Sequence, residues 1–211
     1  MKTMQCLWFF TVGLITFPSL WAQKGETEAI FYREDQLYFG LNYLVVQSQT
    51  SAFELQGLSS QFQFGVLRDI PLHANGRWAV ALGLGFERTN IRSNSQWEGT
   101  TLRYTPNAYR TYSYQGLSIP IEFRWRSSTP TKYAFWRIYS GVKWKRNWAV
   151  GGATPSDVLR PWVPSVYTAI GYNTWNLYFS TTLQSIYRTE ALIVDQGDIG
   201  YLALGLVFFL F

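Results

Sequence analysis

Apolar and polar residues alternate along most of this chain of 211 residues. The alternation is clearest over residues 117–126, where large apolar side chains occupy the odd positions and mostly polar or charged side chains occupy the even ones. Successive side chains of a strand point to opposite faces, so this pattern predicts a strand with one apolar and one polar face. The same period of two predicts eight strands, at residues 36–46, 59–67, 78–89, 114–126, 135–148, 165–172, 175–187 and 201–211. The sixth strand is the weakest and its facing is ambiguous. The eighth is apolar on both faces, so its direction is not assigned.

The last strand favours one fold class. Residues 201–211 form an apolar run that ends on Phe211. The run is too short for a membrane-spanning helix, which needs roughly 20 apolar residues, but it matches one tilted strand of a transmembrane barrel, roughly 9–11 residues. A buried terminal strand of a soluble sheet is the alternative, although exposed apolar ends aggregate. We therefore predict an all-β protein, a transmembrane antiparallel β-barrel of eight strands spanning residues 36–211.

The segment before the barrel has the pattern of an export signal. Lys2 supplies a positive charge, residues 7–17 are mostly apolar, and a cleavage region ends at Ala22. Residues 1–22 are predicted to be a signal peptide and residues 23–35 a short periplasmic lead-in. Cys6, the only cysteine, lies in the signal peptide, so the mature chain is expected to have no disulfide.

The composition agrees with strands that have two unlike faces. Hydrophobic residues make up 47% of the chain and charged residues 15%, yet the mean hydropathy is only −0.06. Opposite faces of barrel strands cancel in such an average. Aromatic residues reach 18%, as expected for girdles at both bilayer interfaces. The net charge of +5 is too weak and too scattered to indicate nucleic-acid binding, so outer-membrane lipid is the expected environment.

The predicted connections alternate in length. Short turns follow the second, fourth and sixth strands, and mostly longer connections occupy residues 47–58, 90–113, 149–161 and 188–197. Outer-membrane barrels have short periplasmic turns and longer extracellular loops. An even number of strands then predicts that both barrel termini lie in the periplasm.

Charged residues on the polar strand faces predict a filled lumen. Ionised side chains facing lipid cost a few kcal/mol each at the membrane midplane, so they are expected to point inward. The predicted lumen cluster is Glu87, Glu122, Arg124, Arg137, Lys143 and Lys145. An eight-stranded barrel is only wide enough to be filled by side chains. A packed, ion-paired plug is therefore the main interpretation. An anion path and a small-ligand site stay open as alternatives.

Arginine and aromatic residues mark a second candidate site, because both types are enriched at protein interfaces. An ordinary basic loop and plain turn chemistry would also account for them. The possible partner surface comprises Arg92, Trp97, Arg103, Tyr104 and Arg110 in the longest loop, with Arg126 and Lys132 at the opposite end.

Catalysis is not indicated by the sequence. His73, the only histidine, lies in a predicted turn, and no metal-ligand spacing or phosphate-binding glycine loop is present. We expect no enzyme activity, no cofactor and no metal.

Four segments carry a family resemblance: 31–36 (FYREDQ), 67–71 (LRDIP), 119–130 (IPIEFRWRSSTP) and 135–143 (FWRIYSGVK). Together they resemble the PorT family of outer-membrane barrels from Bacteroidota. The resemblance implies a role in the type IX secretion system, which exports proteins across the outer membrane and in some relatives supports gliding motility. It implies an accessory or assembly component and no catalytic residues.

The first functional hypothesis is thus a non-enzymatic barrel that supports secretion through contacts with other secretion-system proteins. A small passive porin or ligand-binding barrel is the alternative, and an adhesive surface barrel is a third.

Overall fold

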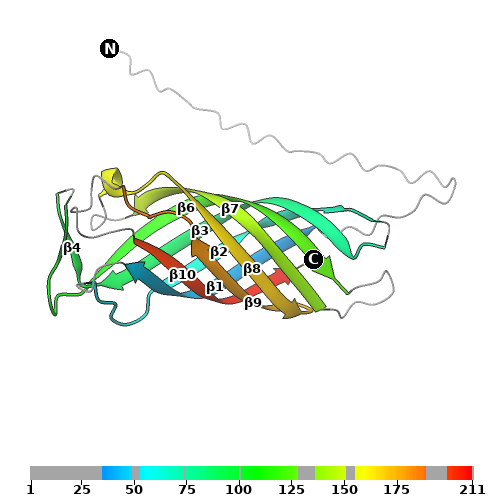
Figure 1. Cartoon of the computed structure of the whole chain (residues 1–211), viewed down its shortest axis with the longest axis horizontal. Helices are drawn as coiled ribbons and strands as arrows, with labels where there is room; N and C mark the ends of the chain where they lie inside the picture. The colour runs from blue at the N-terminus through cyan, green and yellow to red at the C-terminus, as the bar shows by residue number, and fades with distance from the viewer. Residues whose placement is uncertain are drawn as a thin grey trace, which may run out of the picture.

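Eight antiparallel strands close into one barrel (Figure 1). The computed structural model describes residues 35–48, 53–73, 75–99, 101–127, 136–150, 155–188 and 199–210. The strand order around the barrel is β1-β10-β9-β8-β7-β6-β3-β2. The all-β, eight-stranded prediction is therefore confirmed, while the signal peptide and nearly all of the lead-in lie outside the described residues. The barrel strands are β1 (Gln36–Ser48), β2 (Ser60–Pro71), β3 (Trp78–Ser93), β6 (Arg110–Arg126), β7 (Trp136–Val150), β8 (Trp162–Tyr172), β9 (Trp175–Thr182) and β10 (Ile199–Leu210).

The first and last strands close the barrel. β1 and β10 pair antiparallel over twelve positions, from Leu37 opposite Leu210 to Ser48 opposite Ile199. Closure leaves neither strand with the row of unpaired backbone groups that an open sheet edge would expose to lipid.

The period of two places polar residues inside and apolar residues outside. In β1 the even positions from Gln36 to Val46 are buried, whereas the odd positions from Leu37 to Val45 are apolar and face outward, with Leu37 52% exposed and Leu41 60% exposed. The two strands whose facing the sequence left unassigned also alternate between buried and outward positions, although the inner face of β10 is apolar and aromatic. β10 buries Tyr201 and its odd-numbered neighbours, and β8 buries Tyr167 and its odd-numbered neighbours.

Several strands differ in length from their predicted ranges. β2 continues to Pro71, four residues past the predicted end, which carries Asp69 into the barrel. β9 ends at Thr182, well before the predicted end at residue 187. Residues 185–187 are buried one after another, a pattern that a wall strand with one outward face does not give.

The longest predicted loop contains structure of its own. Strands β4 (Ser95–Glu98) and β5 (Thr101–Tyr104) form a separate hairpin within it, and a short 3₁₀ helix η1 (Ser156–Val158) precedes β8. Within the described ranges, no helix is long and apolar enough to cross a bilayer.

The barrel has two unlike ends. We call the end where β1 begins and β10 finishes the turn end. There β8 and β9 are joined by a two-residue turn in which Asn173 has a φ of 54°, a left-handed conformation that asparagine tolerates. We call the opposite end the loop end. Figure 1 shows the β4–β5 hairpin projecting there, away from the C-terminus.

Segments at the loop end pack into what we call the loop-end cap (residues 53–59, 94–99, 101–109, 155–161 and 183–188). The rings of Trp97 and Tyr187 meet edge to face with centroids 5.0 Å apart, and Leu102, on strand β5 of the hairpin, is buried. The Tyr112 hydroxyl, on β6, donates a 2.6 Å hydrogen bond to the Ser95 carbonyl. These contacts fix the hairpin to the barrel.

Candidate functional site

The lumen contains two ion-paired clusters, of which the first lies toward the turn end. We call it the arginine cluster: Asp69, Glu122, Arg124 and Arg126. The Asp69 carboxylate is shared, with one oxygen 3.1 Å from Nη1 of Arg124 and the other 2.9 Å from Nη2 of Arg126. Arg124 also donates from Nε to Glu122 at 2.8 Å. All four side chains are buried, and the planar guanidinium groups suit such paired contacts.

Aromatic rings and backbone complete the arginine cluster. The Arg124 guanidinium lies 4.6 Å from the ring centroid of Tyr139, and Nε of Arg126 donates a 2.6 Å hydrogen bond to the Gly76 carbonyl. Arg137 stands beside them, over the rings of Tyr139 and Phe209. Guanidinium groups stack on aromatic faces readily, and the contact gains strength where water is excluded.

The second cluster lies deeper along the lumen toward the loop end. We call it the lysine cluster: Glu87, Lys143, Lys145, Gln61, Gln63 and Tyr201. Nζ of Lys143 lies 2.6 Å from one Glu87 oxygen, and Nζ of Lys145 lies 3.6 Å from the other. Lys145 also donates to the Tyr201 hydroxyl, and Gln61 donates to both Glu87 and Tyr201. One carboxylate thus serves two buried ammonium groups.

Tyr167 connects the two clusters. Its hydroxyl donates a 2.8 Å hydrogen bond to Glu122, and its ring centroid lies 5.3 Å from Nζ of Lys143. The cavity between the clusters measures about 20 Å³, which is room for a single water molecule. Side chains fill this part of the lumen.

A glycine makes room for Tyr38, another side chain that fills the lumen. Tyr38 crosses the lumen from β1, and a Cβ atom at Gly85 would overlap its hydroxyl. Gly85 therefore faces a space that Tyr38 already fills.

The structure places all six residues of the predicted lumen cluster inside the barrel. It divides them between the two clusters, with Arg137 next to the arginine cluster. Sequence reasoning missed Asp69, Gln61, Gln63, Tyr167 and Tyr201. No clear signal for Asp69 was present in the sequence, because Leu67 and Arg68 reverse the apolar–polar alternation just before it, and only the burial pattern of the folded strand continues through Asp69.

The predicted partner surface holds only in part. Arg92, Arg103 and Arg110 are exposed, while Trp97 and Tyr104 are half-buried within the loop-end cap and pack against buried core residues. Arg126 is fully buried and paired with Asp69, so its assignment to an exposed surface is corrected. The position was misjudged because β6 keeps its inward face up to its last residue. Lys132 lies outside the described residues.

One ion pair and one hydrogen bond of the loop-end cap lie in solvent. Arg103 pairs with Glu98 across the hairpin at 3.0 Å, with both side chains more than half exposed. The Tyr109 hydroxyl donates a 2.9 Å hydrogen bond to Glu54, and this bond to a carboxylate raises the pKa of Tyr109. Among the described residues, no group of histidine, cysteine or carboxylate side chains is arranged to hold a metal ion.

A comparison with protein families decides what kind of barrel this is. The model of the outer membrane protein beta-barrel domain matches residues 21–183, a range that contains β1 to β9. The chain belongs to this outer-membrane β-barrel family. A search of the curated proteins finds no match. Membership in the family agrees with the apolar outer face and accounts for it, since lipid surrounds such barrels.

Proposed function

We propose that this barrel is a non-enzymatic outer-membrane component that supports protein secretion through contacts with other secretion-system proteins. The resemblance to the PorT family indicates type IX secretion, with gliding motility as a further outcome in some relatives. The observation that carries the proposal is the pair of ion-paired clusters filling the lumen. A barrel plugged in this way does not conduct folded cargo, so a role in export has to depend on its outer surfaces.

The orientation we propose places the turn end, with both barrel termini, in the periplasm. The two-residue connection between β8 and β9 supports it, as does the position of the β4–β5 hairpin at the opposite end. Outer-membrane barrels have their short turns in the periplasm. The loop-end cap then faces the cell exterior.

Labelling in intact cells tests this orientation. A single cysteine is introduced at Glu98, on the hairpin, or at Asn75, at the turn end, in a variant whose mature chain has no other cysteine. A membrane-impermeant maleimide is expected to label the Glu98→Cys protein in intact cells and the Asn75→Cys protein only after lysis. The reverse pattern would overturn the orientation.

Export is the decisive measurement of the function itself. A strain lacking the gene is compared with the same strain complemented by the wild-type gene, and periplasmic and secreted proteins are quantified by mass spectrometry. The proposal predicts that the deletion strain retains exported proteins in its periplasm and that complementation restores their release. Unchanged export would overturn it.

A passive anion pore is the second candidate. Among the residues that the structure describes, five buried cations face three buried carboxylates in the lumen, an excess of positive charge. Planar-bilayer recording of the purified barrel separates the candidates. A pore predicts steady conductance that Lys143→Glu alters, whereas the secretion component predicts none.

A further inference from the structure

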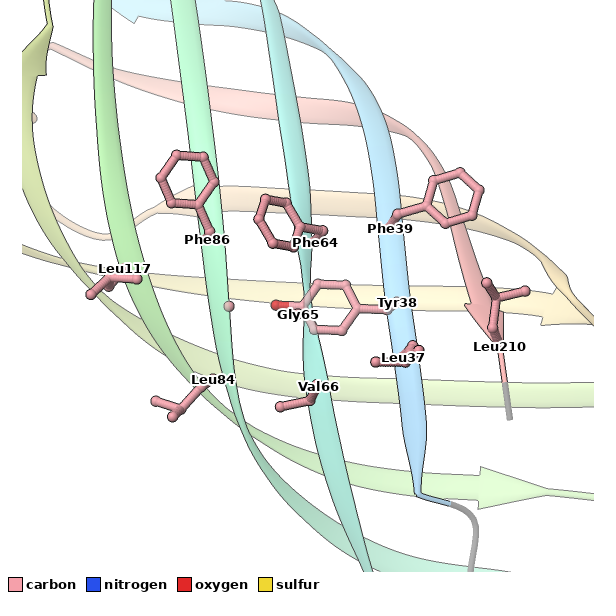
Figure 2. Close-up of a pocket in the computed structure, with 11 residues that line it drawn as sticks. Leu37, Tyr38, Phe39, Phe64, Gly65, Val66, Leu84, Phe86, Leu117 and Leu210 are labelled. Atoms are coloured by element: carbon pink, nitrogen blue, oxygen red, sulfur yellow. The ribbon is translucent and has the colours of Figure 1, made fainter. Parts of the chain in front are cut away.

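The outer face of the barrel has an apolar hollow of about 570 Å³ over β1, β2 and β3. Figure 2 shows its two rows of side chains, one on each side of Gly65 and Tyr38. The rows are Phe39, Phe64 and Phe86 toward the loop end and Leu37, Val66 and Leu84 toward the turn end.

The floor of the hollow is backbone. Gly65 and Gly85 are paired neighbours on β2 and β3, and Tyr38 of the lumen lies directly behind them. The bordering side chains stand out on both sides, with Leu84 62% exposed. The result is a depression in the surface that lipid covers.

Cations stand at the loop-end rim of this hollow. On the outer face, going toward the loop end, the apolar belt is followed by Arg88 on β3 and by Arg146 on β7. Between them on β6, Gln115 lies opposite both Arg88 and Trp148. Arg146 lies opposite Leu117, which itself lies opposite Phe86, so it ends the row of phenylalanines.

The two arginines can act on one ligand. They flank β6 on the same face, two strand spacings apart and offset by two residues along the strands, which puts about 12 Å between their backbones, a gap that two long side chains can close. The Arg146 guanidinium lies 5.8 Å from the ring centroid of Trp162 on β8, the side of β7 away from Arg88, so it has to turn toward β6 to share a ligand with Arg88. Neither arginine has an ion-pair partner within the described part of the chain, whereas the three carboxylates of the barrel strands described here all face the lumen. The outer face at this position is therefore purely cationic.

We propose that this face binds one membrane lipid, with an acyl chain in the hollow and an anionic phosphate headgroup between Arg88 and Arg146. Paired guanidinium groups match the geometry of phosphate oxygens, and aromatic side chains such as Trp148 belong at the headgroup level. Phe86 and Arg88 are successive outward residues of β3, about 7 Å apart, so the phosphate site adjoins the acyl site. Such a lipid site would be present whether or not the barrel takes part in secretion.

Native mass spectrometry of the whole purified barrel in detergent tests the proposal. Dioleoyl phosphatidylglycerol, which is anionic, is titrated against dioleoyl phosphatidylcholine, which has the same acyl chains but a zwitterionic headgroup. The wild-type barrel is expected to retain one phosphatidylglycerol with a preference on the order of tenfold. No retained lipid, or no preference for phosphatidylglycerol over phosphatidylcholine, would overturn the proposal. A face that a partner protein covers in place of lipid would give that result.

Variants separate the two parts of the site. Arg88→Gln with Arg146→Gln is expected to abolish the preference. The matched control Arg103→Gln removes a cation from the same end but off the barrel wall, and should keep it. The Arg88→Lys, Arg146→Lys pair retains the charge without the forked donors and should show an intermediate preference, which tests the site even if the glutamine pair folds poorly.

Filling the hollow tests the acyl part. Leu84→Trp is expected to lower retention of both lipids several-fold and leave the preference unchanged. Equal retention by the wild-type and Leu84→Trp barrels would place the acyl chain elsewhere and overturn the hollow as its site.

Discussion

The two lumen clusters solve the same physical problem with different balances of charge. In the arginine cluster two guanidinium groups face two carboxylates. Asp69 pairs with both Arg124 and Arg126, and Glu122 is a second partner of Arg124. The lysine cluster sets two ammonium groups against Glu87 alone and compensates with neutral donors and acceptors. Buried charges are costly unless they are paired and hydrogen-bonded. The lysine cluster therefore depends on one carboxylate, Glu87, to balance its charge, whereas the arginine cluster has two carboxylates that do so.

The largest effect is expected at Glu87. Glu87→Gln leaves two buried ammonium groups without a counter-charge, and we expect it to lower the free energy of unfolding by about 4 kcal/mol. Urea unfolding from phospholipid vesicles, followed by tryptophan fluorescence, measures this. Adding Lys143→Met should recover a large part of the loss, because it removes one unpaired charge. A loss under about 1 kcal/mol for Glu87→Gln would show that the neutral partners suffice.

A smaller loss is expected from Asp69→Asn. Arg124 keeps Glu122, and Arg126 keeps the Gly76 carbonyl, so we expect about 2–3 kcal/mol. The comparison with Glu87→Gln under the same unfolding conditions is the sharpest test of the contrast between clusters. If Asp69→Asn cost more than Glu87→Gln, the shared carboxylate would be the critical one and the contrast would be reversed.

Packing next to the clusters can be tested without changing any charge. Gly85→Ala puts a methyl group into the position of the Tyr38 hydroxyl, and overpacking of this kind costs about 1–3 kcal/mol. Tyr38→Phe removes that hydroxyl, so the double variant should be more stable than Gly85→Ala alone. Independent, additive effects in the same unfolding assay would show that the two groups do not compete for space.

The smallest effect is expected from an ion pair in solvent. Arg103→Gln breaks the exposed pair with Glu98 on the hairpin, and exposed pairs contribute little because water and salt screen them. We expect a change within about 0.5 kcal/mol. A change as large as that of Asp69→Asn would mean that the hairpin is part of the cooperative unit of the barrel.

The sequence predicted a feature well wherever its two strand faces differ. Over residues 117–126 of β6 the odd positions are apolar and the even positions are mostly polar, so only one orientation of the strand keeps its charged residues out of the lipid. Glu122 and Arg124 were placed in the lumen correctly. In β10 both faces are apolar, so the period of two could not choose between them. There the choice depends on contacts from other strands, such as the Tyr201 hydroxyl, which accepts hydrogen bonds from Lys145 and Gln61.

Strand ends were the less predictable part of the site. Asp69 was assigned to a turn because it stands next to Ile70 and Pro71, and it became a lumen residue only because β2 is longer than expected. Whether a terminal residue such as Arg126 faces water or the lumen depends on a carboxylate distant in sequence. Pairing across 57 residues between Arg126 and Asp69 has no local signal.

The ladder between β1 and β10 has a consequence for the timing of assembly. Its partners come from opposite ends of the described chain, so the loop that must be closed is nearly as long as the barrel domain itself. Contacts between such distant segments form slowly. Until β10 is present, the backbone groups of β1 along this edge have nothing to bind in the hydrocarbon. A chain truncated before residue 199 would therefore enter the membrane with an unpaired edge at β1. We expect such a chain to be degraded or to pair with another chain instead.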